Sequence, residues 1–249
     1  LDARPIARIT LTADPDVARD PLFALVPVRR SNKEPFDLTR LVAPERLVEI
    51  GAAVQNGARF GGTVDEAEVL EWRALTREAL RIEVETPHTF QESVDLFRIG
   101  HREVDANPDG IDFSGPLFET LRLTGQFSRA SAADPTSFAF RSGLEAVFAN
   151  TDTAMGHVWL VTEDNSRETQ IATGADWLRV NLAATAQGIG FQPLSQALQE
   201  FPEMAGPYAQ VHERLAPDGG TVQMLARIGY GPAVGTSPRW PLESRIMNA

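Results

Sequence analysis

The sequence predicts an α+β fold, because helix and strand patterns are both present along one chain of 249 residues. Two short apolar runs, 157–162 and 221–228, have the length and residue types of strands. Residues 65–81 place apolar side chains every three or four positions among charges, which is typical of an amphipathic surface helix. Residues 177–187 are apolar on nearly every face and indicate a buried helix at the centre of the fold.

The composition is that of a folded globular protein, with 43% hydrophobic and 23% charged residues. The formal net charge of −11 argues against a general binder of nucleic acid or of anionic membranes, since an acidic surface repels both. Any anion site must therefore be local. The chain has no cysteine, which excludes disulfides, thiolate catalysis and cysteine-ligated metals. No run reaches the ~18 apolar residues that a membrane helix needs.

The N-terminal part is expected to open with a short strand over residues 6–11, where apolar and polar residues alternate. Asp20 and Pro21 form a helix start, with aspartate as N-cap and proline at the first helical position, and Pro27 ends that helix. Helical spacing continues over 44–53. Glycines mark the turns beyond it: Gly57, Gly61 and Gly62.

Residues 65–150 are expected to form a helical insertion or lid within a single domain that spans 1–249. A helix restarts at Pro87 and runs through Phe97, and a dense turn signal at 107–110 ends it. Two more helical segments are expected over 117–127 and 137–149. Their phenylalanines are expected to pack in a core rather than to stack on a cofactor.

The C-terminal part combines the two strands with the buried helix. A loop is expected over 163–167, and Thr173 to Asp176 lead into the helix, which ends at Gly188. Residues 192–196 read as an extended loop. The strand 221–228 shows one strongly apolar face, and the last part, 236–243, reads as a proline-stiffened arm.

The sequence lacks the motifs that several kinds of catalysis and metal binding need. The sequence has no G-x-S-x-G nucleophile elbow, no phosphate loop and no H-E-x-x-H motif. The four histidines are far apart and lack metal-ligand spacing: His88, His101, His157 and His212. A glycosidase would need a pair of carboxylates on either side of its substrate. The adjacent acidic pairs lie in turns or on solvated helices instead: Asp14/Asp16, Glu66/Glu68 and Asp105/Asp109.

The strongest candidate for binding chemistry is a basic cluster that follows the first helical segment: Arg29, Arg30, Ser31 and Lys33. Arginine offers a planar fork of donors and lysine a mobile point charge, so these side chains could surround a phosphate monoester. The alternative is a solvated basic loop without a ligand.

The order of five motifs resembles the nitroreductase superfamily of flavin mononucleotide (FMN) enzymes. After the basic cluster come the buried helix with Gly188-Ile189-Gly190, then Pro193-Leu194-Ser195, a strand that ends in Gly229-Tyr230-Gly231, and the arm Ser237-Pro238-Arg239-Trp240-Pro241-Leu242. The resemblance covers about residues 20–60 and 155–245. It implies a mainly antiparallel sheet flanked by helices.

The resemblance also implies which residues bind FMN. The ribityl phosphate and part of the ring edge would contact the basic cluster: Arg29, Arg30, Ser31 and Lys33. The arm would add Arg239 to the phosphate, with Ser237 where a second basic residue often stands. Backbone of the loop after the buried helix would lie near the flavin N5: Pro193, Leu194 and Ser195. The flavin itself performs the hydride chemistry, so no protein nucleophile is needed.

Two departures qualify the resemblance. No segment matches the family's N-T-Q-P-W-like motif, whose asparagine contacts the flavin. Residues 20–23, 109–111 and 237–239 resemble the single-chain, pseudo-twofold Acg-like branch, in which that motif lies in a preceding half. The chain starts at Leu1 inside a strand pattern, and we expect a processed or truncated polypeptide that lacks this half. Part of the pocket would then come from residues outside this sequence or from a second copy, as an intrachain pseudo-dimer or a homodimer.

The resemblance implies an FMN-dependent oxidoreductase that passes hydride from NADPH or NADH to a small quinone or nitroaromatic-type acceptor. A second hypothesis is an FMN-binding or sequestering stress-response protein, with little turnover because helices at 111–150 block hydride access. A third is a module that binds another phosphate ligand. We expect no nucleic-acid partner and no membrane insertion, and a cytoplasmic location, with a periplasmic one as the alternative.

Overall fold

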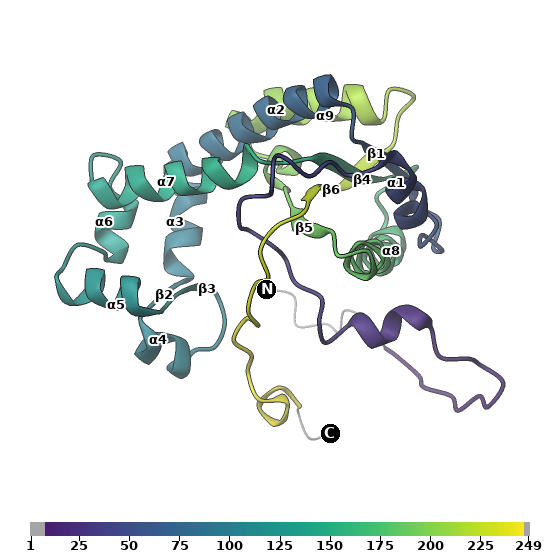
Figure 1. The fold of residues 1–249 in the computed structure, drawn as a ribbon, viewed down its shortest axis with the longest axis horizontal. Coiled ribbons are helices and arrows are strands. Elements are labelled where there is room, and N and C mark those ends of the chain that lie inside the picture. Colours follow the sequence, from purple (N-terminus) through teal and green to yellow (C-terminus); the bar gives the residue numbers. More distant parts are fainter. Residues whose placement is uncertain (1–7, 247–249) are drawn as a thin grey trace.

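The computed structural model describes residues 8–246 and confirms the α+β fold (Figure 1). Its main sheet is antiparallel in all of its pairings, with the strand order β1-β4-β6-β5. These strands are β1 (Arg59–Thr63), β4 (Gly156–Thr162), β5 (Gly190–Pro193) and β6 (Thr221–Gly229). The expected strands at 157–162 and 221–228 are therefore the two central ones.

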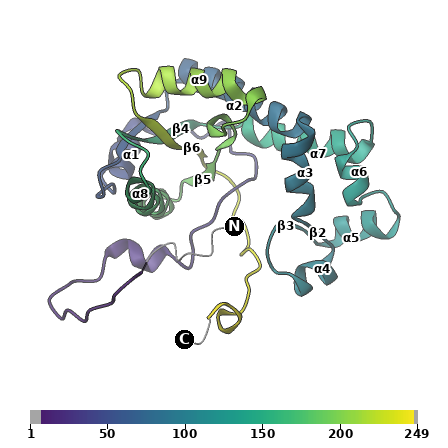
Figure 2. The same ribbon diagram turned by 180° about the vertical axis from the view of Figure 1, so that it is seen from behind.

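Helices cover both faces of this sheet (Figures 1 and 2). On one face, α2 (Glu66–Glu85) and α9 (Ala205–Leu215) share a core with β4 and β6. On the other, α1 (Pro44–Gly51) and α8 (Arg167–Ala186) do the same. The strongly apolar face of β6 is buried as expected, and the other face is buried too, because Leu225 and Ala226 are both fully buried. Central strands between two helical layers bury both faces.

The buried helix is longer than its apolar part. The side chain of Ser166 accepts a hydrogen bond from the backbone N–H of Thr169, which starts α8 at Arg167, so the loop expected over 163–167 ends one residue earlier. The first half of α8 is polar and partly exposed. Most of the second half fills the core as expected, but Leu178 is 43% exposed, so the helix is not buried on every side. The core residues are Val180, Asn181, Leu182, Ala183 and Ala184.

A second group of helices lies beside the main sheet (Figures 1 and 2). They are α3 (Pro87–Asp95), α4 (His101–Ala106), α5 (Pro116–Leu123), α6 (Arg129–Ala133) and α7 (Phe138–Thr151), with the parallel strands β2 (Phe97–Ile99) and β3 (Ile111–Phe113) among them. Most of their phenylalanines pack together, as expected, whereas Phe138 is 75% exposed and lies outside the core. The phenylalanines that pack are Phe90, Phe97, Phe113, Phe118, Phe127 and Phe140. Phe97 lies in a strand, not in the expected helix.

The N-terminal expectations are partly wrong. Residues 8–11 form no strand, and Ile9 is 80% exposed, because no neighbouring strand pairs with them; residues 6 and 7 lie outside the described part. The helix after Asp20 is a short 3-10 helix, η1 (Pro21–Leu25), capped by the aspartate as expected. Gly61 and Gly62 belong to β1 rather than to a turn. A Cβ on Gly61 would come within 2.2 Å of Trp159 Nε1, so this glycine serves close packing.

The segment after β5 packs against α2 and α9, whereas the segment after β6 runs away from them (Figure 1). Residues 192–193 belong to β5, so the expected loop is shorter; η2 (Gln196–Leu198) and η3 (Pro202–Met204) follow. After β6, residues 230–241 extend away from the sheet without regular structure and end in η4 (Leu242–Arg245) (Figure 1). Within residues 8–246, no helix is long and apolar enough to span a membrane.

Candidate functional site

The basic cluster belongs to an extended segment, residues 29–37, which we call the strap. Backbone hydrogen bonds fix the strap across the ends of β5 and β6. The N–H of Asn32 donates to the Phe191 carbonyl at 2.9 Å, and that of Asp37 donates to the Tyr230 carbonyl at 2.7 Å. The strap therefore lies where the resemblance places the flavin-binding loop and the G-Y-G turn, although about 160 residues or more separate it from both in sequence.

Phe36 explains why glycines occur at these strand ends. Its ring packs against Gly190, Gly229 and Gly231 so closely that a Cβ on any of them would lie 2.5–2.9 Å from a ring carbon. None of the three has a positive φ. Their role is thus to let the ring approach the backbone. Gly190 of the G-I-G motif and both glycines of the G-Y-G motif thus make room for the phenylalanine of the strap.

Arg227 in β6 is the buried polar centre of this region, and sequence reasoning did not assign it a role. Its side chain is fully buried, donates to the carbonyl of Glu34 at 2.8 Å and to Gln192 Oε1 at 2.5 Å, and stacks 4.0 Å from the Phe36 ring centroid. Burial lowers the pKa of Arg227 to about 10, so it remains cationic at neutral pH. The available signal was one arginine inside an otherwise apolar strand.

The cations of the strap have the properties of an anion site. Arg30 Nη1 donates to the carbonyls of Pro27 and Arg29, each at 2.8 Å. Its Nε is buried and has no hydrogen-bond partner within the described residues. Among these residues, no carboxylate pairs with Arg29 or with the exposed Lys33. A phosphate could accept from these donors by charge-assisted hydrogen bonds. Ser31 is also exposed.

The loop after β5 lies farther along β6 than the strap does. Pro193, at the end of β5, pairs with Ala226, whereas Gly190, at the start of β5, pairs with Gly229 beside the strap. Leu194 is buried, and its N–H donates to the Leu225 carbonyl at 2.8 Å. Pro193 has no N–H. Ser195 is exposed, and no acceptor for its N–H is found between residues 8 and 246. Of the three residues that the resemblance places near the flavin N5, only Ser195 thus has a backbone donor that could point to a ligand.

The arm starts next to the strap but then leaves it. Asn32 Nδ2 donates to the Pro232 carbonyl at 2.9 Å, which joins the strap to the segment that leads from β6 into the arm. Further on, Trp240 Nε1 donates to Asp109 Oδ2 at 3.0 Å, in the turn before β3. Ser237 and Arg239 are exposed, and within the described residues no hydrogen bond joins either to the strap. The structure therefore joins the strap to β5 through Phe191, while within the described residues no hydrogen bond joins the strap to Leu194, Ser195 or Arg239.

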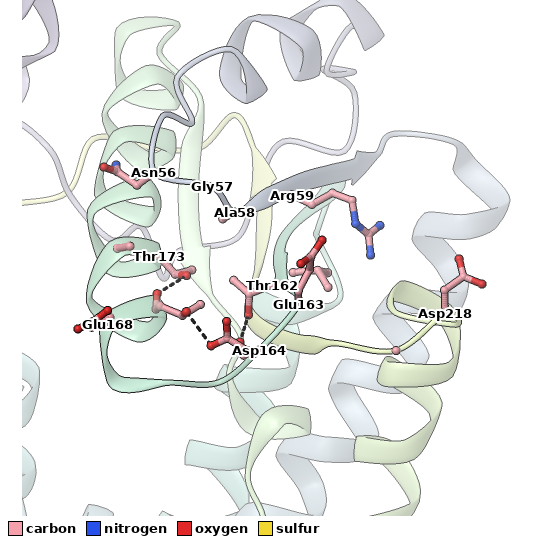
Figure 3. A pocket seen from close by; sticks show the side chains of 14 residues that line it. Asn56, Gly57, Ala58, Arg59, Thr162, Glu163, Asp164, Glu168, Thr173 and Asp218 are labelled. Carbon is pink, nitrogen blue, oxygen red and sulfur yellow. Dashed lines mark hydrogen bonds between the residues drawn. The ribbon is translucent and has the colours of Figure 1, made fainter.

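A cleft of about 630 Å³ lies at the opposite end of the sheet, near the end of β4 and the start of α8 (Figure 3). Four carboxylates line it: Glu163, Asp164, Glu168 and Asp218. Hydrogen bonds from the Ser166 N–H and the Thr169 hydroxyl lower the pKa of Asp164, which keeps it ionised. The cleft would therefore repel a phosphate, and none of the residues predicted to bind FMN lines it.

Within the described residues, no group of three histidine, aspartate or glutamate side chains could hold a metal ion. His157 is buried in β4, and neither of its ring nitrogens has a hydrogen-bond partner there. Burial, together with the charges of Arg73 and Arg227, lowers the pKa of His157 to about 3. This histidine is therefore neutral in the folded protein at neutral pH.

Comparison with known proteins shows the fold of this chain but no family by sequence. No family model and no curated protein matches the sequence. Among solved structures, a nitroreductase with bound FMN from Desulfitobacterium hafniense is 12% identical and covers 93% of this chain and 100% of its own, with a TM-score of 0.53.

Two further structures support the same conclusion. The FMN-dependent nitroreductase NfnB from Mycobacterium smegmatis, solved in complex with NADPH, is 17% identical and covers 91% of this chain and 97% of its own, with a TM-score of 0.53. A BluB-like flavoprotein from Clostridium difficile is 16% identical and covers 93% of this chain and 100% of its own, with a TM-score of 0.51. At such identities the likeness shows a shared fold, along nearly the whole chain.

Proposed function

We propose, from the fold shared with nitroreductase-type FMN proteins, that this protein is an FMN-dependent NAD(P)H oxidoreductase. Hydride would pass from NADPH or NADH through FMN to a small quinone or nitroaromatic-type acceptor. The observation that carries the proposal is the strap. It presents Arg29, Arg30 and Lys33 without carboxylate partners in the described residues, at the strand ends where the resemblance expects the flavin phosphate.

The residues present fit the phosphate end of FMN. The Nε of Arg30 is buried and has no partner in the described residues, so a phosphate oxygen could accept from it once the Arg30 side chain turned toward the ligand, which would remove a cost of about 1–3 kcal/mol. Arg29 and Lys33 would add charge, and the hydroxyl of Ser31 a further donor. Arg239 would join them if the arm moved from its position beside Asp109, and Ser237 with it.

The β5 loop would contact the flavin ring of FMN. The N–H of Ser195 would donate toward the flavin ring, while Pro193 and the buried Leu194 set the position of that N–H. Bound FMN would supply the hydride chemistry, so the protein's part is to bind, orient and exclude water. This division of work suits a chain in which we find no nucleophile motif.

A second candidate function, FMN sequestration with little turnover, is favoured by one contact. Trp240 binds Asp109, and Arg98 pairs with the same carboxylate at 2.8 Å. These contacts tie the arm to the helices beside the sheet. If the arm completes the phosphate site, those helices would follow it toward the flavin. We propose that this helical region, within residues 65–150 of a single domain, acts as a lid.

The opposite wall of the pocket is proposed to come from a second copy of the fold, either in a homodimer or in a pseudo-twofold chain of the Acg-like branch. The mass of the protein in solution, measured by light scattering with and without FMN, tests the first arrangement. A monomer that still retains FMN would refute it.

The deciding experiment is a visible absorption spectrum of the purified protein, incubated with FMN and freed of excess, before and after anaerobic addition of NADPH and then NADH. Bound flavin that bleaches would support the oxidoreductase and identify the donor. Bound flavin that stays oxidised with both donors would favour sequestration. A protein that retains no FMN would refute both functions and leave a site for another anion.

A further inference from the structure

We propose that Arg227 is a positioning residue, which anchors the strap so that its cations meet the phosphate of FMN at a fixed place relative to the β5 loop. This inference rests on the proposed function, since it takes the strap to be the phosphate site. Arg227 itself would not touch the flavin. Its role follows from what its guanidinium contacts.

The burial of Arg227 depends on the strap. An isolated buried charge is costly, and within the described residues no carboxylate pairs with Arg227. Neutral acceptors solvate it instead, and the strap supplies the Glu34 carbonyl at 2.8 Å and the face of Phe36 at 4.0 Å. If the strap lifted away, a charged group would lose its partners inside the sheet. The arginine and the strap therefore hold each other in place.

The sheet fixes Arg227 from both sides. It lies opposite His157 of β4 and Gln192 of β5 in the strand register, and Gln192 Oε1 accepts from its Nε at 2.5 Å. Thr153 then connects the two parts: its hydroxyl oxygen accepts from Arg227 Nη1 at 3.3 Å and from the backbone N–H of Phe36 at 2.8 Å. The planar fork thus contacts the strap, β5 and the residue that holds Phe36 at once.

Lysine cannot replace these contacts. Its ammonium keeps the charge but has neither a plane to stack on Phe36 nor donors spread widely enough to reach Gln192 and Glu34 together. Arg227→Lys should leave the strap in its place in only part of the molecules. If that part is one tenth, the apparent dissociation constant of FMN rises about tenfold. Riboflavin, which lacks the phosphate and would share only a ring-edge contact with the strap, should lose less affinity than FMN.

The test compares wild type, Arg227→Lys and the control Arg59→Lys. Arg59 also donates to a backbone carbonyl, that of Leu215 at 3.0 Å, but at the other end of the sheet. Dissociation constants for FMN and for riboflavin are measured by equilibrium dialysis. Hydrogen–deuterium exchange of strap residues 32–37 is measured in the flavin-free proteins. We expect Arg227→Lys to weaken FMN about tenfold and riboflavin less than about twofold, and to speed exchange in the strap; the control should do neither.

Equal weakening of both flavins in Arg227→Lys, or unchanged exchange of the strap, would overturn the inference. A wild-type protein that binds neither flavin would overturn the proposed function instead, and the exchange data would then decide the anchoring role alone. If Arg227→Lys does not fold, Thr153→Val, which removes the acceptor shared by Arg227 and Phe36, should produce the same selectivity for FMN; equal loss of both flavins there would also overturn the inference.

Discussion

The buried His157 leads to a prediction about acid stability that needs no ligand. Its ring is fully buried in β4, has no hydrogen-bond partner within the described residues and faces Trp72, with ring centroids 6.2 Å apart. Burial first, and then Arg73 on α2 and Arg227 on β6, lower its pKa from 6.5 to about 3. The folded protein therefore resists protonation of a group that the unfolded chain protonates readily.

The sign and the size follow from proton linkage. Because the folded pKa is the lower one, this contribution to stability is intact above pH 6.5 and is lost as the pH falls from 6.5 toward 3. One pKa unit corresponds to about 1.4 kcal/mol. Between pH 8 and pH 5, His157 should thus cost the protein about 2 kcal/mol of its free energy of unfolding.

His157→Leu supplies the comparison, since leucine has a similar volume, cannot titrate and leaves no orphaned nitrogen. Urea unfolding at pH 8, 7, 6 and 5 gives the free energy of unfolding of both proteins. We expect the wild type to lose about 2 kcal/mol more than His157→Leu over this range, and the variant to be at least as stable at pH 7. Parallel pH profiles for the two proteins would refute the reasoning.

Three further predictions concern other contacts. Gly229→Ala, whose Cβ would lie 2.5 Å from Phe36, should lower the free energy of unfolding in urea by about 1–3 kcal/mol. Gly174→Ala, in an open part of α8, should raise it by about 0.5–1 kcal/mol. An unchanged free energy of unfolding for Gly229→Ala would contradict the close packing against Phe36. Arg29→Gln should weaken FMN binding about tenfold or more in dialysis, and the surface control Arg46→Gln should not; equal affinities would remove Arg29 from the site. Asp176→Ala should lower the free energy of unfolding by about 3 kcal/mol or more, because the buried carboxylate accepts from the N–H groups of residues 55 and 56 at 2.8–3.0 Å. If the variant unfolds at the same urea concentration as the wild type, these hydrogen bonds do not stabilise the fold.

The sequence predicted those parts of the fold that depend on neighbours along the chain. The strand at 157–162 was found from its compact apolar run and the helix from residue 65 from its apolar periodicity, and both signals are local. Residues 8–11 alternate apolar and polar side chains, yet form no strand, since alternation cannot supply a partner strand. Gly61 and Gly62 were read as a turn because the approach of Trp159 cannot be seen from their own surroundings.

In the candidate site, too, only the residues whose signal is local could be found from the sequence. The basic residues at 29–33 could be found because charge is visible in the sequence, whatever the fold. Arg227 could not be assigned a role, since its partners at 34, 153 and 192 come from three distant segments. Whether Arg239 joins the strap stays a prediction, because it depends on how an arm without regular structure lies.

The two ends of β6 explain how a protein with a net charge of −11 can present an anion site. Its start lies beside the carboxylates of the cleft and its end beside the strap, and nine residues of strand separate them by roughly 26 Å. Counterions screen charges beyond about 8 Å at physiological ionic strength. A dissolved anion close to the strap therefore interacts with the arginines and the lysine of the strap, while counterions screen the distant carboxylates of the cleft. Net charge governs the protein's behaviour in bulk solution, and the final approach of a ligand is governed by the nearest few side chains.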